Sequence, residues 1–537
     1  MFKRTVIFFS LIMLCICIMM FKLDNISNGG ELRDAAVCQH SYKLKVSEVR
    51  GTIYDCRNYP LVNQRSKLMA AVVPNVQTIN KLSEIVPKSE FPKVCEYISY
   101  NRPFSTQVNA GIKTDDIDIF KVPIRYSGIT LAPHIIGYID SNKNGVFGIE
   151  KAYNDFLSEG NQAICVKYNV DASNRILTGE NKIIDDKSYM SSKGVVLNID
   201  KRIQSLAEEV SSKYLEKGAV VITQVPNCEI RACVSLPNFM PQSVSDYLND
   251  KNSPLINRAA CQYNVGSVFK LITVATALEK GIRDNYIYEC KGGIEVEDRV
   301  FHCFNGKPHK GINMEEAIAY SCNTYFVDLI QHMNPNSVAD MSRKFGLGKS
   351  IELAPGMFTA QGNIPNSKEL EDEKNAANFS FGQGSLMASP IQISGLINAI
   401  ASNGEYTTPT LIKGLVNENL HFIDIPKPEN PNRVIKKDTA EKLKGYMKAS
   451  IEYGTSLRGK PESVEAAAKT STAETGIVVD GKKVIQAWYA GFFPFEKPKY
   501  SIVVLSEDAS GGGESCGPVF KEIVDRMNKE IPELFID

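Results

Sequence analysis

The 537-residue chain has no excess of charge of either sign, because 61 basic residues balance 61 acidic ones. A face that binds nucleic acid is expected to have basic side chains interleaved with aromatic ones, and the chain has no such run. Internal repeats and long low-complexity tracts are missing too. We therefore expect two or three globular domains, no nucleic-acid partner and no repeat architecture.

Sequence motifs for metal binding are also missing. The chain has no C-x-x-C pair and no H-E-x-x-H, and its six histidines are scattered. We therefore expect no metal and no cofactor. Of its 13 cysteines, Cys15 and Cys17 lie in an N-terminal apolar run, which leaves an odd number outside it. Most are expected to be small core residues, and Cys290 and Cys303 are the best candidates for a disulfide.

The N-terminal segment "MFKRTVIFFSLIMLCICIMMFK" has the features of a membrane anchor. Lys3 and Arg4 precede an apolar run from Thr5 to Phe21, which is at the short end of the lengths that cross a bilayer. Basic residues in front predict a cytoplasmic N-terminus. A cleaved signal peptide is the alternative, but no small-x-small site follows the run. This favours an uncleaved anchor with the rest of the chain outside the cytoplasm.

The remaining chain is expected to divide into a linker and non-catalytic domain (23–194) and a larger domain (195–537), after a cytoplasmic tip and anchor (1–22). The segment "VVLNIDKRIQSLAEEVSSKYLEKGAVVITQV" predicts a strand, an amphipathic helix and a strand that open the larger domain. Near the C-terminus, "AAAKTSTAET", "QAWYAGFFPF" and "YSIVVLSED" predict an antiparallel meander. A helix with Pro518 in its first turn follows. The fold class is therefore α+β.

The segment "YNVGSVFKLITVATALEKG" places Ser267 three residues before Lys270, at the start of an apolar run. Ser267 could cap a buried helix that stops at Gly281. It could also be a nucleophile, because residues three apart share a helical face. Burial of Lys270 favours its neutral amine, which can accept a hydroxyl proton. This segment alone leaves both interpretations open.

Two downstream motifs favour the nucleophile. "AIAYSCNTYF" carries Ser321 and Asn323, and Lys469 starts the strand-like "KTSTAET". Ser267 and Lys270 form the only S-x-x-K in the chain. The order S-x-x-K, S-x-N and K-T is the one used by penicillin-binding proteins and serine β-lactamases.

From about residue 195 to its end, the chain resembles the transpeptidase domain of class B penicillin-binding proteins. The resemblance extends to "GAVVITQVPNCEIRACVSLPNF" and "FGQGSLMASPIQISGLINAIASNGE", and more weakly upstream to "VRGTIYDCRNYPLV" and "GIEKAYNDFLSEG". It implies an antiparallel sheet flanked by helices, as in serine β-lactamases, preceded by a smaller mixed domain and one transmembrane helix. Val265 stands where the family usually has proline, and Ser471 where it usually has glycine.

The resemblance also implies a reaction. Ser267 attacks the penultimate D-Ala carbonyl of a D-Ala–D-Ala stem peptide and releases the last D-Ala, and Lys270 takes the hydroxyl proton. Ser321, hydrogen-bonded between Lys270 and Lys469, passes a proton to the leaving amine. The implied substrate-binding residues are Asn323, Lys469, Thr470, Ser471 and Thr472.

The implied oxyanion hole is formed by the backbone N–H groups of Ser267 and Thr472. An amine from a neighbouring peptidoglycan strand resolves the acyl-enzyme and forms a cross-link. β-Lactams mimic the substrate and acylate Ser267.

Several alternatives share parts of this pattern. A D,D-carboxypeptidase or a β-lactamase would use the same first step, and an inactive scaffold or a membrane β-lactam sensor would not need the full reaction. The large preceding domain and the uncleaved anchor favour a cell-wall synthase in a bacterial membrane. Its expected partner is a membrane glycan polymerase of the elongation, division or sporulation machinery, and all three machineries stay open.

Overall fold

The structure, a computed structural model, describes residues 2–28, 41–112, 114–128, 130–159, 162–171, 176–177, 182–185, 193–303, 306–427, 429–479, 482–507 and 511–535. These residues form two compact units. Unit 1 comprises Met1–Arg50, Asn63–Arg125 and Gly160–Ser192, and unit 2 comprises Gly51–Val62, Tyr126–Glu159 and Lys193–Asp537. Unit 2 thus holds the predicted larger domain together with two segments from earlier in the chain.

Helix α1 (Phe2–Asn28) contains the predicted anchor. Its stretch Phe2–Asn25 is long and apolar enough to cross a membrane, with a mean hydropathy of 2.7 in an 18-residue window. The helix extends beyond the apolar run at both ends because no proline or glycine interrupts it before Gly29.

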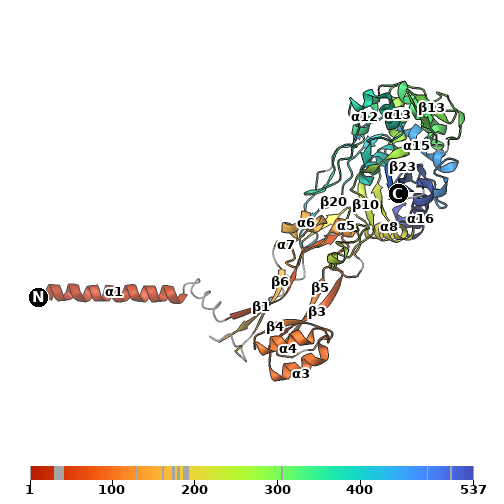
Figure 1. Cartoon of the computed structure of the whole chain (residues 1–537). Coiled ribbons are helices and arrows are strands. Elements are labelled where there is room, and N and C mark those ends of the chain that lie inside the picture. Colours follow the sequence, from red (N-terminus) through yellow and green to blue (C-terminus); the bar gives the residue numbers. More distant parts are fainter. Residues whose placement is uncertain are drawn as a thin grey trace. The chain divides into compact units, whose positions relative to one another are not determined.

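The rest of unit 1 contains two small antiparallel sheets. In one, β1 (Ser41–Val49) pairs with β6 (Gln162–Asn169), which pairs with β7 (Ile183–Asp185). In the other, β3 (Arg65–Val72) lies between β4 (Phe104–Val108) and β5 (Ile117–Ile124). Helices α3 (Val76–Ile85) and α4 (Phe91–Ser99) share a hydrophobic core with the second sheet and lie beside it in Figure 1.

A five-stranded antiparallel sheet with the order β10-β9-β25-β24-β23 is the centre of unit 2. Its strands are β9 (Gly218–Gln224), β10 (Glu229–Leu236), β23 (Ala467–Val479), β24 (Lys482–Phe493) and β25 (Tyr500–Ser506). The last three are consecutive in the chain and adjacent in the sheet. The predicted meander is therefore confirmed, and so is the α+β class.

Helices cover both faces of this sheet. On one face, α8 (Lys201–Tyr214) and α16 (Gly517–Glu530) form one hydrophobic core with the strands. Both helices were predicted from the sequence, and Pro518 lies in the first turn of α16. On the other face, α14 (Pro390–Ala401) packs against β9, β24 and β25.

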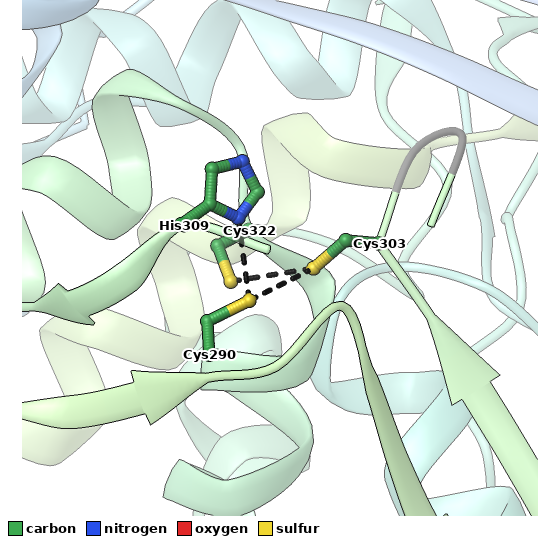
Figure 2. A group of neighbouring side chains, drawn as sticks. All are labelled: Cys290, Cys303, His309 and Cys322. Carbon is green, nitrogen blue, oxygen red and sulfur yellow. Dashed lines mark hydrogen bonds between the residues drawn. The ribbon is translucent and has the colours of Figure 1, made fainter. Parts of the chain in front are cut away.

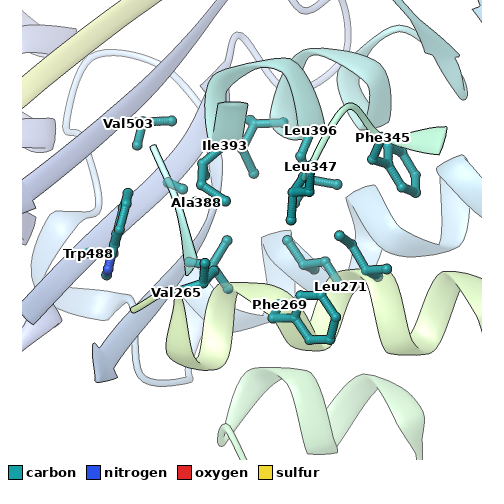
Figure 3. Packing of buried hydrophobic residues seen from close by; sticks show 14 of the residues in the cluster. Val265, Phe269, Leu271, Phe345, Leu347, Ala388, Ile393, Leu396, Trp488 and Val503 are labelled. Carbon is teal, nitrogen blue, oxygen red and sulfur yellow. The ribbon is translucent and has the colours of Figure 1, made fainter. Parts of the chain in front are cut away.

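The core on the α14 side holds the segment that carries Ser267 (Figure 3). Val265, Phe269 and Leu271 are fully buried and belong to the same cluster as Ile393 of α14 and Trp488 of β24. Full burial of such a side chain contributes roughly 1.5–3 kcal/mol. The Ser267 segment is therefore fixed to the sheet through its neighbours.

The other elements of unit 2 surround this frame. A four-stranded sheet has the order β2-β8-β20-β21, with β2 (Thr52–Tyr54), β8 (Gly194–Leu197), β20 (Ile412–Val416) and β21 (Phe422–Asp424). Two hairpin-like pairs are β12 (Tyr288–Cys290) with β15 (Lys310–Ile312), and β13 (Gly293–Val296) with β14 (Arg299–His302). Further helices are α5 (Pro133–Ile136), α6 (Gly148–Ala152), α7 (Asn154–Ser158), α9 (Lys270–Glu279), α10 (Met314–Ala319), α11 (Asn323–Gln331), α12 (Pro335–Lys344), α13 (Glu373–Ser380) and α15 (Lys437–Glu452).

Candidate active site

Ser267 lies in a 3-10 turn (Gly266–Phe269) directly before α9. It caps neither element, because the N-cap residues are Val265 and Phe269 and neither element has a side-chain cap. The interpretation of Ser267 as a helix cap is therefore wrong. Gly266 has a φ of 59°, a left-handed conformation that favours glycine, and places the half-buried Ser267 at the turn.

Lys270 begins α9 and is fully buried. Its Nζ lies 2.7 Å from the Ser321 carbonyl oxygen, 3.1 Å from Ser321 Oγ and 2.7 Å from Asn323 Oδ1. Burial lowers the pKa of its amine to about 7. A neutral amine donates only two hydrogen bonds, and the two contacts of 2.7 Å, to the Ser321 carbonyl and to Asn323 Oδ1, can accept both. The lone pair of the amine is then left to accept a proton from a hydroxyl.

Ser321 and Asn323 lie at the junction of α10 and α11. Ser321 has a φ of 56°, a conformation that a serine rarely adopts, and Asn323 is the first residue of α11. The amide of Asn323 is held on both sides: Oδ1 accepts from Lys270, and Nδ2 donates to the carbonyl of His302 at 3.1 Å. The S-x-N motif is therefore bonded both to Lys270 and to the end of β14.

Lys469, on β23, is also fully buried. Its Nζ donates to the Thr470 carbonyl at 2.9 Å and to Thr455 Oγ1 at 3.5 Å. Among the described residues its hydrogen bonds do not include Ser321, so only the Lys270 half of the predicted relay is formed. Desolvation, followed by the charge of Lys270, lowers the pKa of Lys469 well below its usual value.

The K-T motif and the two residues after it (469–472), here called the third motif, contain three more side chains, and each makes a different contact. Thr470 donates to Thr455 Oγ1 at 2.9 Å, and the Thr472 hydroxyl accepts from the Gly512 N–H at 3.3 Å. Ser471 is 2% exposed and donates to the Val265 carbonyl at 2.8 Å. The Ser471 hydroxyl therefore joins the third motif to the segment before Ser267.

A cavity of about 580 Å³ brings the three motifs together. It is lined by Ser267, Ser321, Asn323, Thr470, Ser471 and Thr472, among others. One wall is β23, which is the edge strand of the five-stranded sheet. An edge strand has backbone N–H and C=O groups free to pair with an extended peptide. The site can therefore present a hydroxyl, a buried amine and a peptide-binding edge to one ligand.

Three cysteines and a histidine gather beside the S-x-N motif (Figure 2). Cys290, Cys303, His309 and Cys322 each offer a sulfur or ring nitrogen, and these four atoms lie within 4.8 Å of one another. The predicted disulfide is wrong, because the sulfurs of Cys290 and Cys303 are 3.6 Å apart and both cysteines are free. No compact sequence motif marks this cluster, and its one signal in the sequence is Cys322 inside S-x-N.

The family described as "Penicillin binding protein transpeptidase domain" matches residues 218–525, more than half of the chain. The chain belongs to the class B penicillin-binding proteins. This membership, together with the apolar helix α1, fits a single-pass membrane protein.

Curated relatives and solved structures agree with this membership. Stage V sporulation protein D of Bacillus subtilis (strain 168) is 25% identical to this penicillin-binding protein, over 94% of this chain and 81% of that protein. Peptidoglycan D,D-transpeptidase PbpA of Mycolicibacterium smegmatis is 29% identical over 56% of this chain and 65% of its own length. The penicillin-binding protein in a complex with MreC from Helicobacter pylori has a similar fold, with a TM-score of 0.66, 22% identity, and coverage of 92% of this chain and 99% of that chain.

Sequence reasoning missed two further residues of this penicillin-binding protein. Thr455 follows α15 and contacts both Lys469 and Thr470. His309 lines the cavity and stacks on Tyr320 with ring centroids 6.0 Å apart. Neither residue belongs to a three-residue motif, so only the tertiary structure brings it to the site.

Proposed function

We propose that this chain is a peptidoglycan D,D-transpeptidase that works through an acyl-enzyme on Ser267. The observation that carries the proposal is the fully buried Lys270 amine, which bonds Ser321 and Asn323 beside the cavity that Ser267 lines. A serine hydroxyl that caps no helix, with a buried amine of lowered pKa one helical turn away in the sequence, is an arrangement that can activate the hydroxyl as a nucleophile.

In the first step, the Ser267 Oγ–carbon bond forms and the carbon–nitrogen bond to the terminal D-Ala breaks. The lone pair of Lys270 takes the hydroxyl proton. Ser321, within hydrogen-bonding distance of Lys270, gives its proton to the leaving amine and receives one from Lys270 in its place. The developing oxyanion accepts hydrogen bonds from the backbone N–H groups of Ser267 and Thr472, which supply the electrostatic stabilisation.

Binding of the stem peptide uses β23 and the residues beside it. The edge strand pairs with the extended peptide, Asn323 holds a peptide amide, and Lys469 with Thr470 and Thr472 holds the terminal carboxylate. Burial lowers the pKa of the Lys469 amine, and a bound carboxylate would raise that pKa again and favour the charged amine. In the second step, an amine of a neighbouring strand forms a bond to the acyl carbon. The bond from that carbon to Ser267 Oγ breaks, and a proton lost by the amine returns to Oγ.

The anchor and the relatives support a proposed cellular setting for this chain. Helix α1 would hold the catalytic unit on the outer side of a bacterial membrane, with Lys3 and Arg4 inside. A similar fold occurs in the complex of PBP2 with MreC from Helicobacter pylori. The proposed partner of this chain is a membrane glycan polymerase of one of the cell-wall machineries.

The test uses the full chain in detergent with fluorescent penicillin and intact-mass spectrometry. Wild type is expected to gain one covalent adduct, and Ser267→Ala none. The matched control is Ser245→Ala, which removes an exposed hydroxyl outside the cavity and should acylate like wild type.

A second assay separates the reaction classes. With a D-Ala–D-Ala stem peptide and an acceptor amine, a transpeptidase forms the cross-linked product. Hydrolysis of the peptide without cross-linking would favour a D,D-carboxypeptidase instead. A full-rate adduct in Ser267→Ala would overturn the assignment of the nucleophile.

A further inference from the structure

The cluster of Cys290, Cys303, His309 and Cys322, here called the Cys3His cluster, has the dimensions of a tetrahedral metal site. The sulfur atoms of Cys303 and Cys322 are 3.4 Å apart, and His309 Nδ1 lies 3.4 Å from Cys290 Sγ. Ligands at about 2.3 Å (sulfur) and about 2.0 Å (nitrogen) from one tetrahedral zinc ion lie roughly 3.4–3.8 Å from one another. A disulfide would require sulfurs about 2.0 Å apart.

The four ligands come from separate turns that converge on one point (Figure 2). Cys290 ends β12, Cys303 follows β14 and His309 precedes β15. Cys322 is the N-cap residue of α11. Gly292 allows the two hairpin-like pairs to meet, because it has a φ of 91° and a Cβ there would lie 2.3 Å from the Gly306 carbonyl oxygen. The local backbone is therefore shaped to bring the sulfurs together.

One hydroxyl lies within hydrogen-bonding distance of all three sulfurs. The Thr324 hydroxyl, in the first turn of α11, lies 3.2 Å from Cys290 Sγ and 3.4 Å from the sulfurs of Cys303 and Cys322. Hydroxyl donors and a helix N-terminus both stabilise a thiolate. Cys516, by contrast, is a buried cysteine whose thiol donates to the Ala487 carbonyl, as an ordinary core cysteine does.

We propose that the Cys3His cluster binds one zinc ion, with Cys290, Cys303 and Cys322 as thiolates and His309 through Nδ1. Three sulfurs and an imidazole select zinc over the hard ions magnesium and calcium. Four protein ligands leave no open position, so the site is structural. The thiol protons pass to solvent as the ion binds.

The ion would fix the S-x-N motif. Cys322 lies between Ser321 and Asn323, and Asn323 donates to the carbonyl of His302, the residue before Cys303. One zinc ion would therefore hold both ends of this contact, and with it the two residues, Ser321 and Asn323, whose oxygens accept hydrogen bonds from Lys270. This role of the metal in acylation rests on the proposed function, whereas metal binding itself does not.

The experiment measures metal content and penicillin acylation on the full chain purified in detergent. Elemental analysis of wild type should find about one zinc per chain, the stoichiometry of a closed four-ligand site. Removing zinc with a strong chelator should slow acylation roughly 10²-fold, since misplaced catalytic groups cost about that much. Adding zinc back should restore the rate.

Variants separate the ligands from other buried thiols. Cys303→Ala should lose zinc, and the control Cys233→Ala, which removes a buried thiol from β10, should keep it. If Cys303→Ala does not fold, His309→Gln keeps all three thiols and should bind zinc at least 10-fold more weakly. Cobalt added to the zinc-free chain should give the intense visible bands of a tetrahedral thiolate site in wild type and in Cys233→Ala, but not in Cys303→Ala.

Ser267→Ala distinguishes the failure of this inference from the failure of the proposed function. It should retain zinc while forming no penicillin adduct. The proposal would be overturned if the purified chain contained no zinc and its Cys303 and Cys322 could be alkylated only after reduction. That result would show that the two cysteines form a disulfide instead. Equal zinc content in Cys303→Ala and wild type would also overturn the proposal, and an acylation rate unchanged by zinc removal would overturn the coupling to Ser321 and Asn323.

Discussion

Replacing Ser471 perturbs the contact between the third motif and the segment before Ser267. The Ser471 hydroxyl donates to the Val265 carbonyl at 2.8 Å in a buried position. A Cβ built on Gly266 would lie only 2.3 Å from Ser471 Oγ, so the hydroxyl packs closely against this glycine. Any substitution here therefore changes a hydrogen bond, the packing, or both.

Three variants separate the two effects. Ser471→Ala removes the hydrogen bond and leaves the Val265 carbonyl without this donor, which costs about 1–3 kcal/mol. Ser471→Thr keeps the hydroxyl but adds a methyl group at this closely packed position, which costs about 1–3 kcal/mol. Ser471→Val does both, so we expect a loss of about 2–6 kcal/mol in the free energy of unfolding.

The assay pairs thermal unfolding with the rate of acylation by fluorescent penicillin. Because Val265 lies two residues before Ser267, the valine variant should acylate roughly 10²-fold more slowly, as expected for a nucleophile displaced by about 1 Å. The alanine and threonine variants should fall between wild type and valine in both measurements. Wild-type stability and acylation in Ser471→Val would refute this reasoning.

Three further predictions follow from other contacts. Lys270→Arg keeps the positive charge but cannot be deprotonated, so it should lose acylation; a near-native rate in stopped-flow measurements would contradict the role of Lys270 as the base. Thr455→Val removes the hydroxyl that contacts Lys469, and should reduce second-order acylation about fivefold, or about 1 kcal/mol, without changing the melting temperature. His134 is buried against the Pro254 carbonyl, and burial lowers its pKa to about 4. As the pH falls, His134 therefore becomes protonated in the unfolded chain before it does in the folded chain. The free energy of unfolding should fall by at most roughly 3 kcal/mol as the pH drops from about 7 to about 4. His134→Gln should flatten the dependence of the melting temperature on pH.

The sequence predicted those parts of the fold that depend on local patterns. The helical spacing of Val519, Phe520, Ile523, Val524 and Met527 predicted α16, and all five side chains are fully buried. The strand, helix and strand at residue 195 and the final meander were found for the same reason. Their apolar periodicity is set by the face that each element buries.

The candidate site was predicted as far as its motifs extend. The apolar run around Lys270 correctly indicated a buried amine, because the apolar residues on both sides of Lys270 pack in the core and bury it with them. The Cys3His cluster was not found, since its members are separated by unlike spacings and meet only when two hairpin-like pairs dock on α11. The hydroxyl of Ser471 was assigned to the ligand side, and only the packing shows that it bonds Val265.

The central claim, an acyl-enzyme on Ser267, is tested most directly by locating the acyl group itself. The full chain in detergent would be treated with a stem-peptide thioester that ends in D-Ala, quenched in acid, digested and mapped by mass spectrometry. We predict that the acyl group is found on the peptide that contains Ser267, and that a D-amino acid acceptor added before the quench removes it. An acyl group on any other residue, or turnover of the thioester by Ser267→Ala at the wild-type rate, would contradict the account.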